Sequence, residues 1–455
     1  MTADYQLAVI GGGPAGLAAA VNASDHGIRV ALFDDQPQPG GQIYRNLENS
    51  SVDPAILGPD YAQGATLLRA LRDSSVDYYP QASVWYLDRQ RQIGVLQPQG
   101  SRCVSAERIV IACGAQERPM PFPGWDKPGV MTAGAAQTLL KSNALLPDDG
   151  VVLAGRGPLM LLLAQQLIRA GVRIGALLET TAPGSWRRAA KHLPGALKAS
   201  DYLFKGWEMM RTIRKAGVPR FRHVENLRAE GGERLSAVSF RSNGVDHRIE
   251  TQLLLTHDGV IPEVQMAQSA DCRLDWNEQQ QCWHTRVNRW GESSQNGIFI
   301  AGDACGIGGA IVGQVSGQLA GLQIAHQLGF LERGERDKLA EPLQRRRRRH
   351  LAIRPFLDAW FGHPGSEPVE DDTLICRCEG VEAAEIRAVI ALGCPGPNQA
   401  KAFTRCGMGA CQGRFCASSV ERLFAQQLDV SPAEIGRYRA RPPLKPVTLG
   451  QLAGH

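Results

Sequence analysis

The sequence predicts an α/β protein with two βαβ units of the dinucleotide-binding type and a small cysteine-rich module at its C-terminal end. Two observations predict the units: an apolar strand, a glycine-rich turn and a helix occur at the N-terminus, and again from about residue 150. A third predicts the module. Six of the eleven cysteines lie within residues 376–416, where an even spread would place about one.

Composition sets the broad class. The chain has 455 residues, enough for two or three domains, and its 43% apolar and 21% charged residues are ordinary for a globular protein. A net charge of +5 is mild, so no nucleic-acid partner is predicted. The first residues run directly into a strand, without the pattern of a secretory leader. We therefore expect a cytoplasmic protein. Any association with the inner face of the membrane would be through its partners.

The first βαβ unit carries a nucleotide-binding signature. A strand leads into Gly11-x-Gly13-x-x-Gly16, a helix follows, and a second strand ends at Asp34. In this pattern the first glycine makes a tight turn, the second lets a pyrophosphate approach the backbone, and the third lets the helix pack on the strand. The N-terminus of the helix stabilises the phosphate charge. A carboxylate at Asp34 can accept hydrogen bonds from a ribose. We predict that this turn, including Pro14 and Ala15, binds a nucleotide.

Three further segments resemble the two-dinucleotide-domain flavoproteins, the group of glutathione and thioredoxin reductases. They read "PGGQIYR", "ERIVIACGAQERP" and "GIFIAGDACG". Cys113 stands where that family usually has Thr. The resemblance implies FAD at the first site, held also by Gly40, Gly41, Gln42, Ala112, Gly114, Gly302 and Asp303.

The second βαβ unit departs from the nucleotide-binding pattern. It has Gly155, Gly157 and a carboxylate, Glu179, at the end of its second strand, but Met160 stands at the third glycine position. A large side chain there crowds the helix–strand packing, which favours a retained fold with a degenerate NAD(P) site. Because the Arg156 side chain in this loop can bind a phosphate, nucleotide binding at the second site remains an alternative. Since no redox-active cysteine pair precedes residue 376, disulfide reduction is disfavoured.

The domain organisation follows from these segments. A run of five arginines, 345–349, reads as a solvated helix face or linker, with contact to a partner as the less favoured alternative. We predict an FAD domain at 1–120 and 291–340, a second dinucleotide domain at 121–290, a linker at 341–371, a cysteine module at 372–430 and a tail at 431–455.

The cysteine module has the ligand pattern of a metal centre. Cys376 and Cys378 point to one side of an extended segment, and a helical stretch, "VEAAEIRAVIALG", returns the chain toward Cys411 and Cys416. Four thiolates from two loops suit a metal site. Zinc is the alternative, although structural zinc sites usually pair Cys-x2-4-Cys knuckles.

This spacing resembles the [2Fe-2S] module of the bacterioferritin-associated ferredoxins. The resemblance implies that Cys376, Cys378, Cys411 and Cys416 are the ligands of a [2Fe-2S] cluster. It leaves out Cys394 and Cys406.

The whole arrangement resembles the large electron-transfer subunits of heteromeric amino- and imino-acid dehydrogenases. Examples are the alpha subunit of D-hydroxyproline dehydrogenase and the corresponding large subunits of opine oxidases and of hydrogen cyanide synthase. In that group a separate amino-acid-oxidase-like (beta) flavoprotein oxidises the amine, often with FMN at the subunit interface. A small ferredoxin-like (gamma) subunit is a frequent third partner, and electrons leave for a quinone or other acceptor.

The sequence itself offers no catalytic acid/base pair or nucleophile, which agrees with an electron relay. We favour a complex of the D-hydroxyproline type. Two alternatives are a self-sufficient NAD(P)H-dependent reductase and a scaffold protein with vestigial sites.

Overall fold

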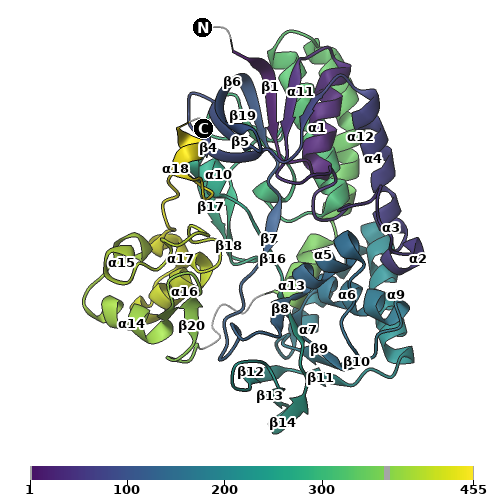
Figure 1. Ribbon diagram of the computed structural model, residues 1–455. Coiled ribbons are helices and arrows are strands. Elements are labelled where there is room, and N and C mark those ends of the chain that lie inside the picture. The colour runs from purple at the N-terminus through teal and green to yellow at the C-terminus, as the bar shows by residue number, and fades with distance from the viewer. Residues whose placement is uncertain (1–2, 363–368, 454–455) are drawn as a thin grey trace.

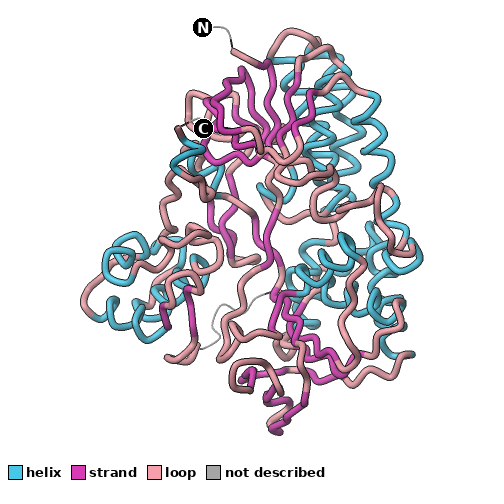
Figure 2. The backbone as a smooth tube through the Cα atoms, viewed as in Figure 1, coloured by secondary structure: helices cyan, strands magenta, loops and turns pink. Residues whose placement is uncertain are grey.

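Residues 3–362 and 369–453 are described by the computed structural model, which has two sheet regions and a separate helical module (Figures 1 and 2). The first sheet has seven strands in the order β3-β2-β1-β6-β5-β4, with β19 paired to β6. Strands β19, β6, β1, β2 and β3 are parallel, and β4 and β5 continue from β6 as an antiparallel meander. The bounds are β1 Tyr5–Ile10, β2 Val30–Phe33, β3 Asp77–Tyr79, β4 Ser83–Leu87, β5 Gln92–Gln97, β6 Gly100–Ile111 and β19 Ile298–Ile300.

Small residues let two helices pack closely beside this sheet. The alanine-rich α1 (Pro14–Asp25) buries almost all of its alanines and contacts α11 (Ala310–Gln327) along much of its length. A Cβ at Gly317 of α11 would lie 2.0 Å from the Ala15 carbonyl oxygen. Helices α2 (Pro54–Leu57), α3 (Pro59–Ala62), α4 (Gly64–Asp73) and α12 (Arg333–Leu351) complete this side of the molecule (Figure 1).

The second sheet has five parallel strands in the order β11-β10-β9-β15-β8. Its strands are β8 Val130–Thr132, β9 Val151–Arg156, β10 Ile174–Glu179, β11 Arg220–Arg222 and β15 Leu254–Asp258. An antiparallel sheet of β12 (Val224–Glu230), β13 (Ala237–Ser242) and β14 (Val245–Glu250) follows β11. The helices of this region are α5 Ala133–Asn143, α6 Pro158–Arg169, α7 Ser185–Ala190, α8 Leu193–Ala196 and α9 Ser200–Lys215.

Two short antiparallel pairs lie between the sheet regions. They are β7 (Ala115–Glu117) with β16 (Val260–Pro262), and β17 (Leu274–Asn277) with β18 (Cys282–Thr285). Helix α10 (Gln265–Ser269) follows β16. Much of the segment 341–371 is helical, because α12 continues to Leu351 and α13 spans Arg354–Phe361.

The cysteine module forms a compact unit with its own core. It contains β20 (Leu374–Cys376), β21 (Val381–Glu382), α14 (Ala383–Ala391), α15 (Pro397–Thr404) and α16 (Ala417–Leu428) around a cluster of buried apolar residues. The predicted helix between the two cysteine pairs is α14. The tail carries α17 (Pro432–Ile435) and α18 (Leu449–Leu452) and runs from the module up to the first sheet (Figure 1).

Within the described residues, no helix is both long and apolar enough to cross a membrane.

Candidate cofactor cavity and cysteine cluster

One cavity of about 1500 Å³ opens along the first βαβ unit and continues to the second. All but two of the thirteen residues predicted to bind the cofactor line it. The other two, Gly16 and Gly40, stand behind the lining: a Cβ at Gly16 would lie 1.8 Å from the Gly11 carbonyl oxygen, and the Gly40 N–H donates to the Gly12 carbonyl at 2.8 Å. The residues that line the cavity are Gly11, Gly13, Pro14, Ala15, Asp34, Gly41, Gln42, Ala112, Gly114, Gly302 and Asp303.

The glycine turn between β1 and α1 leaves open space for a ligand backbone. Gly11 has φ +108° and a Cβ there would lie 2.5 Å from the Ala112 carbonyl oxygen, so a side chain is excluded. Gly41 comes from the loop after β2, and its added Cβ would lie 2.8 Å from the Gly13 Cα. The cavity wall is therefore bare backbone at the N-terminus of α1, which suits a pyrophosphate.

Asp34, at the end of β2, has an unsatisfied carboxylate oxygen. Its Oδ1 accepts from the Gln36 N–H at 3.2 Å, whereas the buried Oδ2 has no hydrogen-bond partner among the described residues. Burial raises the pKa of Asp34 from 3.8 to about 6. A buried carboxylate oxygen without a donor is costly, and a hydroxyl of a bound ribose would satisfy it.

The other end of the first site is built from strand ends and the start of α11. Asp303 Oδ1 accepts from the backbone N–H groups of Gly308 and Gly309 at 2.8 and 3.0 Å, which fixes the loop before α11. Cys113 lines the cavity beside them, and burial raises the pKa of its thiol to about 12. The thiol is therefore neutral at physiological pH and not a thiolate nucleophile.

A buried lysine fixes the loop that contains Gln42. The Lys141 ammonium donates to the backbone carbonyls of Gln42 and Ile43, both at 3.1 Å. Burial, with a contribution from Arg45, lowers its pKa to about 8. Sequence reasoning missed Lys141, because a lysine inside an amphipathic helix such as α5 normally marks the solvent face.

Two ion pairs line the cavity where it reaches the second unit. Arg156 of the glycine turn is 1% exposed and contacts Asp258, with Nε 2.6 Å from Oδ1. Glu179, at the ribose-binding position, accepts a hydrogen bond from Arg220 Nε at 3.2 Å. Met160 is buried in the core behind the turn. Arg156 and Glu179 thus already have partners within the protein, although both line the cavity together with Met160.

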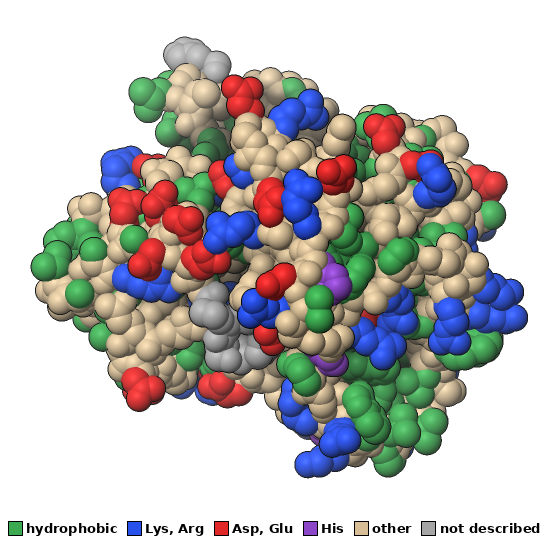
Figure 3. Space-filling view, turned by 90° about the horizontal axis from the view of Figure 1, so that it is seen from below, with side chains coloured by type: hydrophobic (Ala, Val, Ile, Leu, Met, Phe, Trp, Pro, Cys, Tyr) green, Lys and Arg blue, Asp and Glu red, His purple; other side chains and the backbone are tan. Residues whose placement is uncertain are grey.

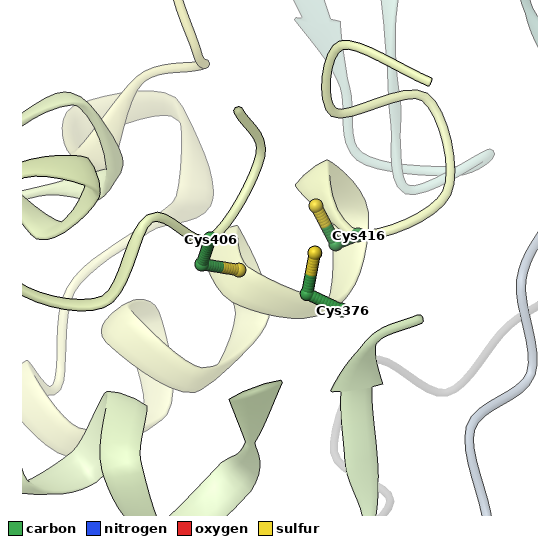
Figure 4. Close-up of side chains that lie close together, drawn as sticks. All are labelled: Cys376, Cys406 and Cys416. Atoms are coloured by element: carbon green, nitrogen blue, oxygen red, sulfur yellow. The ribbon is translucent and has the colours of Figure 1, made fainter. Parts of the chain in front are cut away.

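Three cysteine thiols converge in the C-terminal module (Figure 4). The Sγ atoms of Cys376, Cys406 and Cys416 lie within 4.8 Å of one another, and all three residues are buried. Cys376 ends β20, Cys416 precedes α16, and Cys406 lies in the loop after α15. Hydrogen bonds from Cys406 and then Cys416 lower the pKa of Cys376 to about 2. The contact with Cys376 raises the pKa of both Cys406, to about 12, and Cys416.

The remaining predicted ligands, Cys378 and Cys411, contact each other beside this group. The Cys411 N–H lowers the pKa of Cys378, but burial and the Cys411 thiol raise it more, so the net shift is upward. A Cβ at Gly409 would lie 2.2 Å from the Cys378 Cβ, so a glycine is required there. Cys394 lies apart in a turn, where its thiol contacts the Gly396 carbonyl at 3.5 Å. The structure thus brings the four predicted ligands into one region and adds Cys406 to it.

The loop from Cys411 to Cys416 rests directly on the cofactor cavity. Gln116 Nε2 donates to the Arg414 carbonyl at 2.7 Å, and Gln265 Nε2 donates to the Gln412 carbonyl at 2.6 Å. Arg414 itself lines the cavity, with its Nε 3.1 Å from Glu263 Oε2. The residues that make these contacts lie 147 to 298 positions apart, and no local pattern in the sequence indicated them.

The tail reinforces the same junction. The Tyr438 ring covers Gly407 in the cysteine module. Beyond it, Leu444 donates its N–H to the Trp85 carbonyl at 2.8 Å and accepts from Arg414 at 3.1 Å, and Lys445 pairs with Asp35.

Comparison with known proteins agrees with this architecture. Residues 5–329 match the family model "Pyridine nucleotide-disulphide oxidoreductase", and residues 371–455 match "Sarcosine oxidase A3 domain". The large opine oxidase chain of Rhizobium meliloti is 41% identical over 99% of this chain and 87% of its own length. The HcnB chain of hydrogen cyanide synthase from Pseudomonas protegens is 30% identical over 96% of this chain and 95% of its own.

Among solved structures, L-proline dehydrogenase from P. horikoshii superposes with a TM-score of 0.70 at 20% identity, covering 98% of this chain and 79% of that one. This likeness supports the fold. The comparisons confirm the predicted two-dinucleotide-binding flavoprotein fold and the resemblance to chains of heteromeric oxidases. The chain belongs to the pyridine nucleotide-disulphide oxidoreductase family and is a homologue of the large opine oxidase chain.

Proposed function

We propose that this chain is the electron-transfer component of a heteromeric dehydrogenase for amino or imino acids. In this proposal FAD occupies the first βαβ unit, and a [2Fe-2S] cluster is bound by Cys376, Cys378, Cys411 and Cys416. A partner amino-acid-oxidase-like flavoprotein oxidises the amine. Electrons then pass through this chain to a quinone or another acceptor. Further components are FMN at the interface with the partner and a small ferredoxin-like protein.

The observation that carries the proposal is the contact between the two candidate sites. Arg414, between two proposed cluster ligands, lines the same cavity as Gly11 and Asp34. A flavin accepts electrons in pairs, whereas an iron–sulfur centre passes them singly. Gln116 and Gln265 fix the cysteine loop against that cavity and so hold the distance between the two groups constant.

The donor sets fit the two groups. The unsatisfied Asp34 Oδ2 and the bare glycine turn suit a ribose and a pyrophosphate. The thiols of the module suit soft metal centres. Of the four proposed ligands, Cys376 and Cys416 are buried, whereas Cys411 is partly exposed and Cys378 is exposed. The chain's own residues would bind, orient and shield these groups.

The ion pairs of the second unit support a relay over an NAD(P)H-dependent reductase. Arg156 is paired with Asp258 and Glu179 with Arg220, so the groups that would contact a nicotinamide nucleotide already have partners in the protein. Drawing Arg156 away from its buried partner would cost about 3–5 kcal/mol if one charge were left alone. Mixing the purified flavoprotein with NADH should therefore bleach the flavin slowly, and fast bleaching would contradict the relay.

Cofactor analysis of cysteine variants tests the cluster assignment. The full chain, purified without oxygen, should contain flavin and two iron atoms. We expect Cys411→Ser to lose the iron and keep the flavin, whereas Cys394→Ser, the matched control in the same module, keeps both. Cys406→Ser should also keep its iron. Complete loss of iron in a folded Cys406→Ser protein would show that Cys406 is a ligand, and a wild-type protein without flavin and iron would indicate a scaffold.

The substrate is proposed by class only, because its pocket belongs to the partner chain. Opine oxidase is named for opines, and the sequence resemblance also includes D-hydroxyproline dehydrogenase, the type we favour. Purifying the complex and testing D-hydroxyproline, opines, proline and glycine as electron donors would identify the substrate.

A further inference from the structure

Helices α7 and α9 carry a patch of exposed aromatic and basic side chains, three of which line the end of the cavity formed by the second unit. Its members are Trp186, Arg187, Phe204, Trp207, Arg211 and Arg214. Three of these residues are aromatic and largely exposed: Trp186 is 60% exposed, Phe204 62% and Trp207 55%. These are unusually large apolar surfaces to leave in water. Figure 3 shows hydrophobic side chains beside Lys and Arg side chains at the right of the molecule, the side on which α9 lies in Figure 1.

The spacing within α9 builds one continuous face. Phe204, Trp207 and Arg211 follow at intervals of three and four, which places them on one side of the helix. The Phe204 and Trp207 rings are 5.7 Å apart, and the Arg211 guanidinium lies 5.3 Å from the Trp207 ring. On α7 the Arg187 guanidinium likewise lies 5.9 Å from the Trp186 ring.

The charge of the patch points to an anionic surface. Residues 185–215 contain eight Lys and Arg against two Asp and Glu, a formal charge of +6, whereas the whole chain carries +5. The positive charge is thus concentrated in this segment. The exposed arginines at the end of α12 add to it, since Arg349 reaches Asp201 of α9 at 3.4 Å.

Lysine distinguishes a membrane from a protein partner at this surface, because Trp, Phe and Arg are common at protein interfaces whereas lysine is depleted there. The segment exposes Lys191, Lys198 and Lys215, while Lys205 pairs with Asp60. Tryptophan and phenylalanine flanked by Lys and Arg are typical of helices that lie in the plane of an anionic bilayer surface.

We propose that the patch on α7 and α9 docks this chain directly on a bilayer containing anionic phospholipids. The aromatic rings enter the headgroup region, and the arginines contact lipid phosphates. Trp186, Trp207 and Arg214 also line the far end of the large cavity, so docking brings the mouth of that cavity to the lipid surface. The docking does not depend on the proposed electron relay, although it would suit an acceptor dissolved in the membrane.

Co-sedimentation with vesicles tests the proposal. The full chain should sediment with vesicles of phosphatidylcholine and phosphatidylglycerol, remain in solution with phosphatidylcholine alone, and dissociate as salt is raised. Each basic side chain near such a surface is worth a factor of roughly five in binding. The Arg187→Gln/Arg211→Gln double variant should therefore bind about 25-fold more weakly.

A matched control separates the patch from net charge. Arg241 and Arg248 lie on β13 and β14 and are also exposed, so Arg241→Gln/Arg248→Gln changes the net charge equally. This control should retain vesicle binding. Phe204→Gln, at a residue outside the cavity lining, should weaken binding without altering flavin and iron content, which keeps this test distinct from that of the relay.

Three outcomes would overturn the proposal. The first is a wild-type chain that does not co-sediment with anionic vesicles. The second is equal loss of binding in the patch and control variants. The third is protection of Trp186 and Trp207 from chemical modification by an added partner protein but not by vesicles, which would identify the patch as a protein interface.

Discussion

Replacement of Asp34 by Asn should change flavin affinity and protein stability in opposite directions. In the unliganded protein the Asp34 carboxylate is 6% exposed, and its Oδ2 is buried without a hydrogen-bond partner among the described residues. A neutral amide removes the cost of burying that charge. The same change weakens the hydrogen bonds that we propose the carboxylate accepts from the flavin nucleotide.

The sign of the stability effect follows from the pKa of Asp34, which burial raises from 3.8 to about 6. Because the folded state binds the proton more tightly than the unfolded chain, Asp34 lowers the stability of the unliganded protein as pH rises from about 4 through 6. A shift of about 2 units corresponds to about 3 kcal/mol. At neutral pH the unliganded Asn variant should therefore be more stable by up to this amount.

The effect on affinity has the opposite sign. Hydrogen bonds to a charged group contribute about 1.5–3 kcal/mol, so the Asn variant should bind FAD about 10- to 100-fold more weakly at neutral pH. Donors on the ligand favour the ionised carboxylate, so binding releases a proton. Wild-type affinity should therefore fall as pH drops below 6, by up to about tenfold per pH unit, while the affinity of the Asn variant stays flat.

Flavin fluorescence titration across pH, together with thermal unfolding of the flavin-free protein, measures both effects. The matched control is Asp35→Asn, which removes a neighbouring exposed carboxylate that pairs with Lys445. If Asp34→Asn matched this control in affinity, stability and pH profile, Asp34 would not contact the nucleotide and the assignment would be wrong.

Two further predictions concern the cysteine module. Gly409→Ala should lower the iron content, because the added Cβ would lie 2.2 Å from the Cys378 Cβ and overpacking of this kind costs about 1–3 kcal/mol. Iron analysis measures this effect, and a normal iron content would mean that the loop adapts to the larger side chain. The control is Gly334→Ala, whose added Cβ meets no atom within 4 Å. Arg414→Ala should leave Glu263 unpaired, lower the stability of the holoprotein by about 1–3 kcal/mol and slow reoxidation of the flavin by the cluster. Stopped-flow absorbance would measure that rate, and an unchanged rate would show that Arg414 does not hold the two sites together.

The local parts of the site were predictable from sequence. The glycine turn, Asp34 and the start of α11 depend on residues within a few positions of one another, so strand, turn and helix patterns located them. The proposal that the second site is degenerate came from Met160 alone, one residue in a three-glycine pattern.

The non-local parts were not predictable. The partner of Arg156 is Asp258, 102 positions away on another strand, and sequence spacing carries no signal for such a pair. In the cysteine module, spacing separated Cys406 from the proposed ligands, but the fold of α15 and the following loop brings its thiol beside Cys376 and Cys416. Which residues of distant segments contact each other is decided by tertiary packing, and a single sequence carries no direct signal of that packing.

The C-terminal tail has a consequence for the order of biosynthesis. Tyr438, Leu444 and Lys445 connect the cysteine module to the first sheet, and they follow both the glycine turn and the cysteine loops in the chain, so they leave the ribosome after them. Domains fold as they are synthesised, from the N-terminal end. The glycine turn and the cysteine loops are therefore synthesised before Leu444 and Lys445 can close this end of the cavity, which leaves an interval in which each proposed cofactor can enter its site. Binding of the tail to the first sheet then completes the folding of the protein.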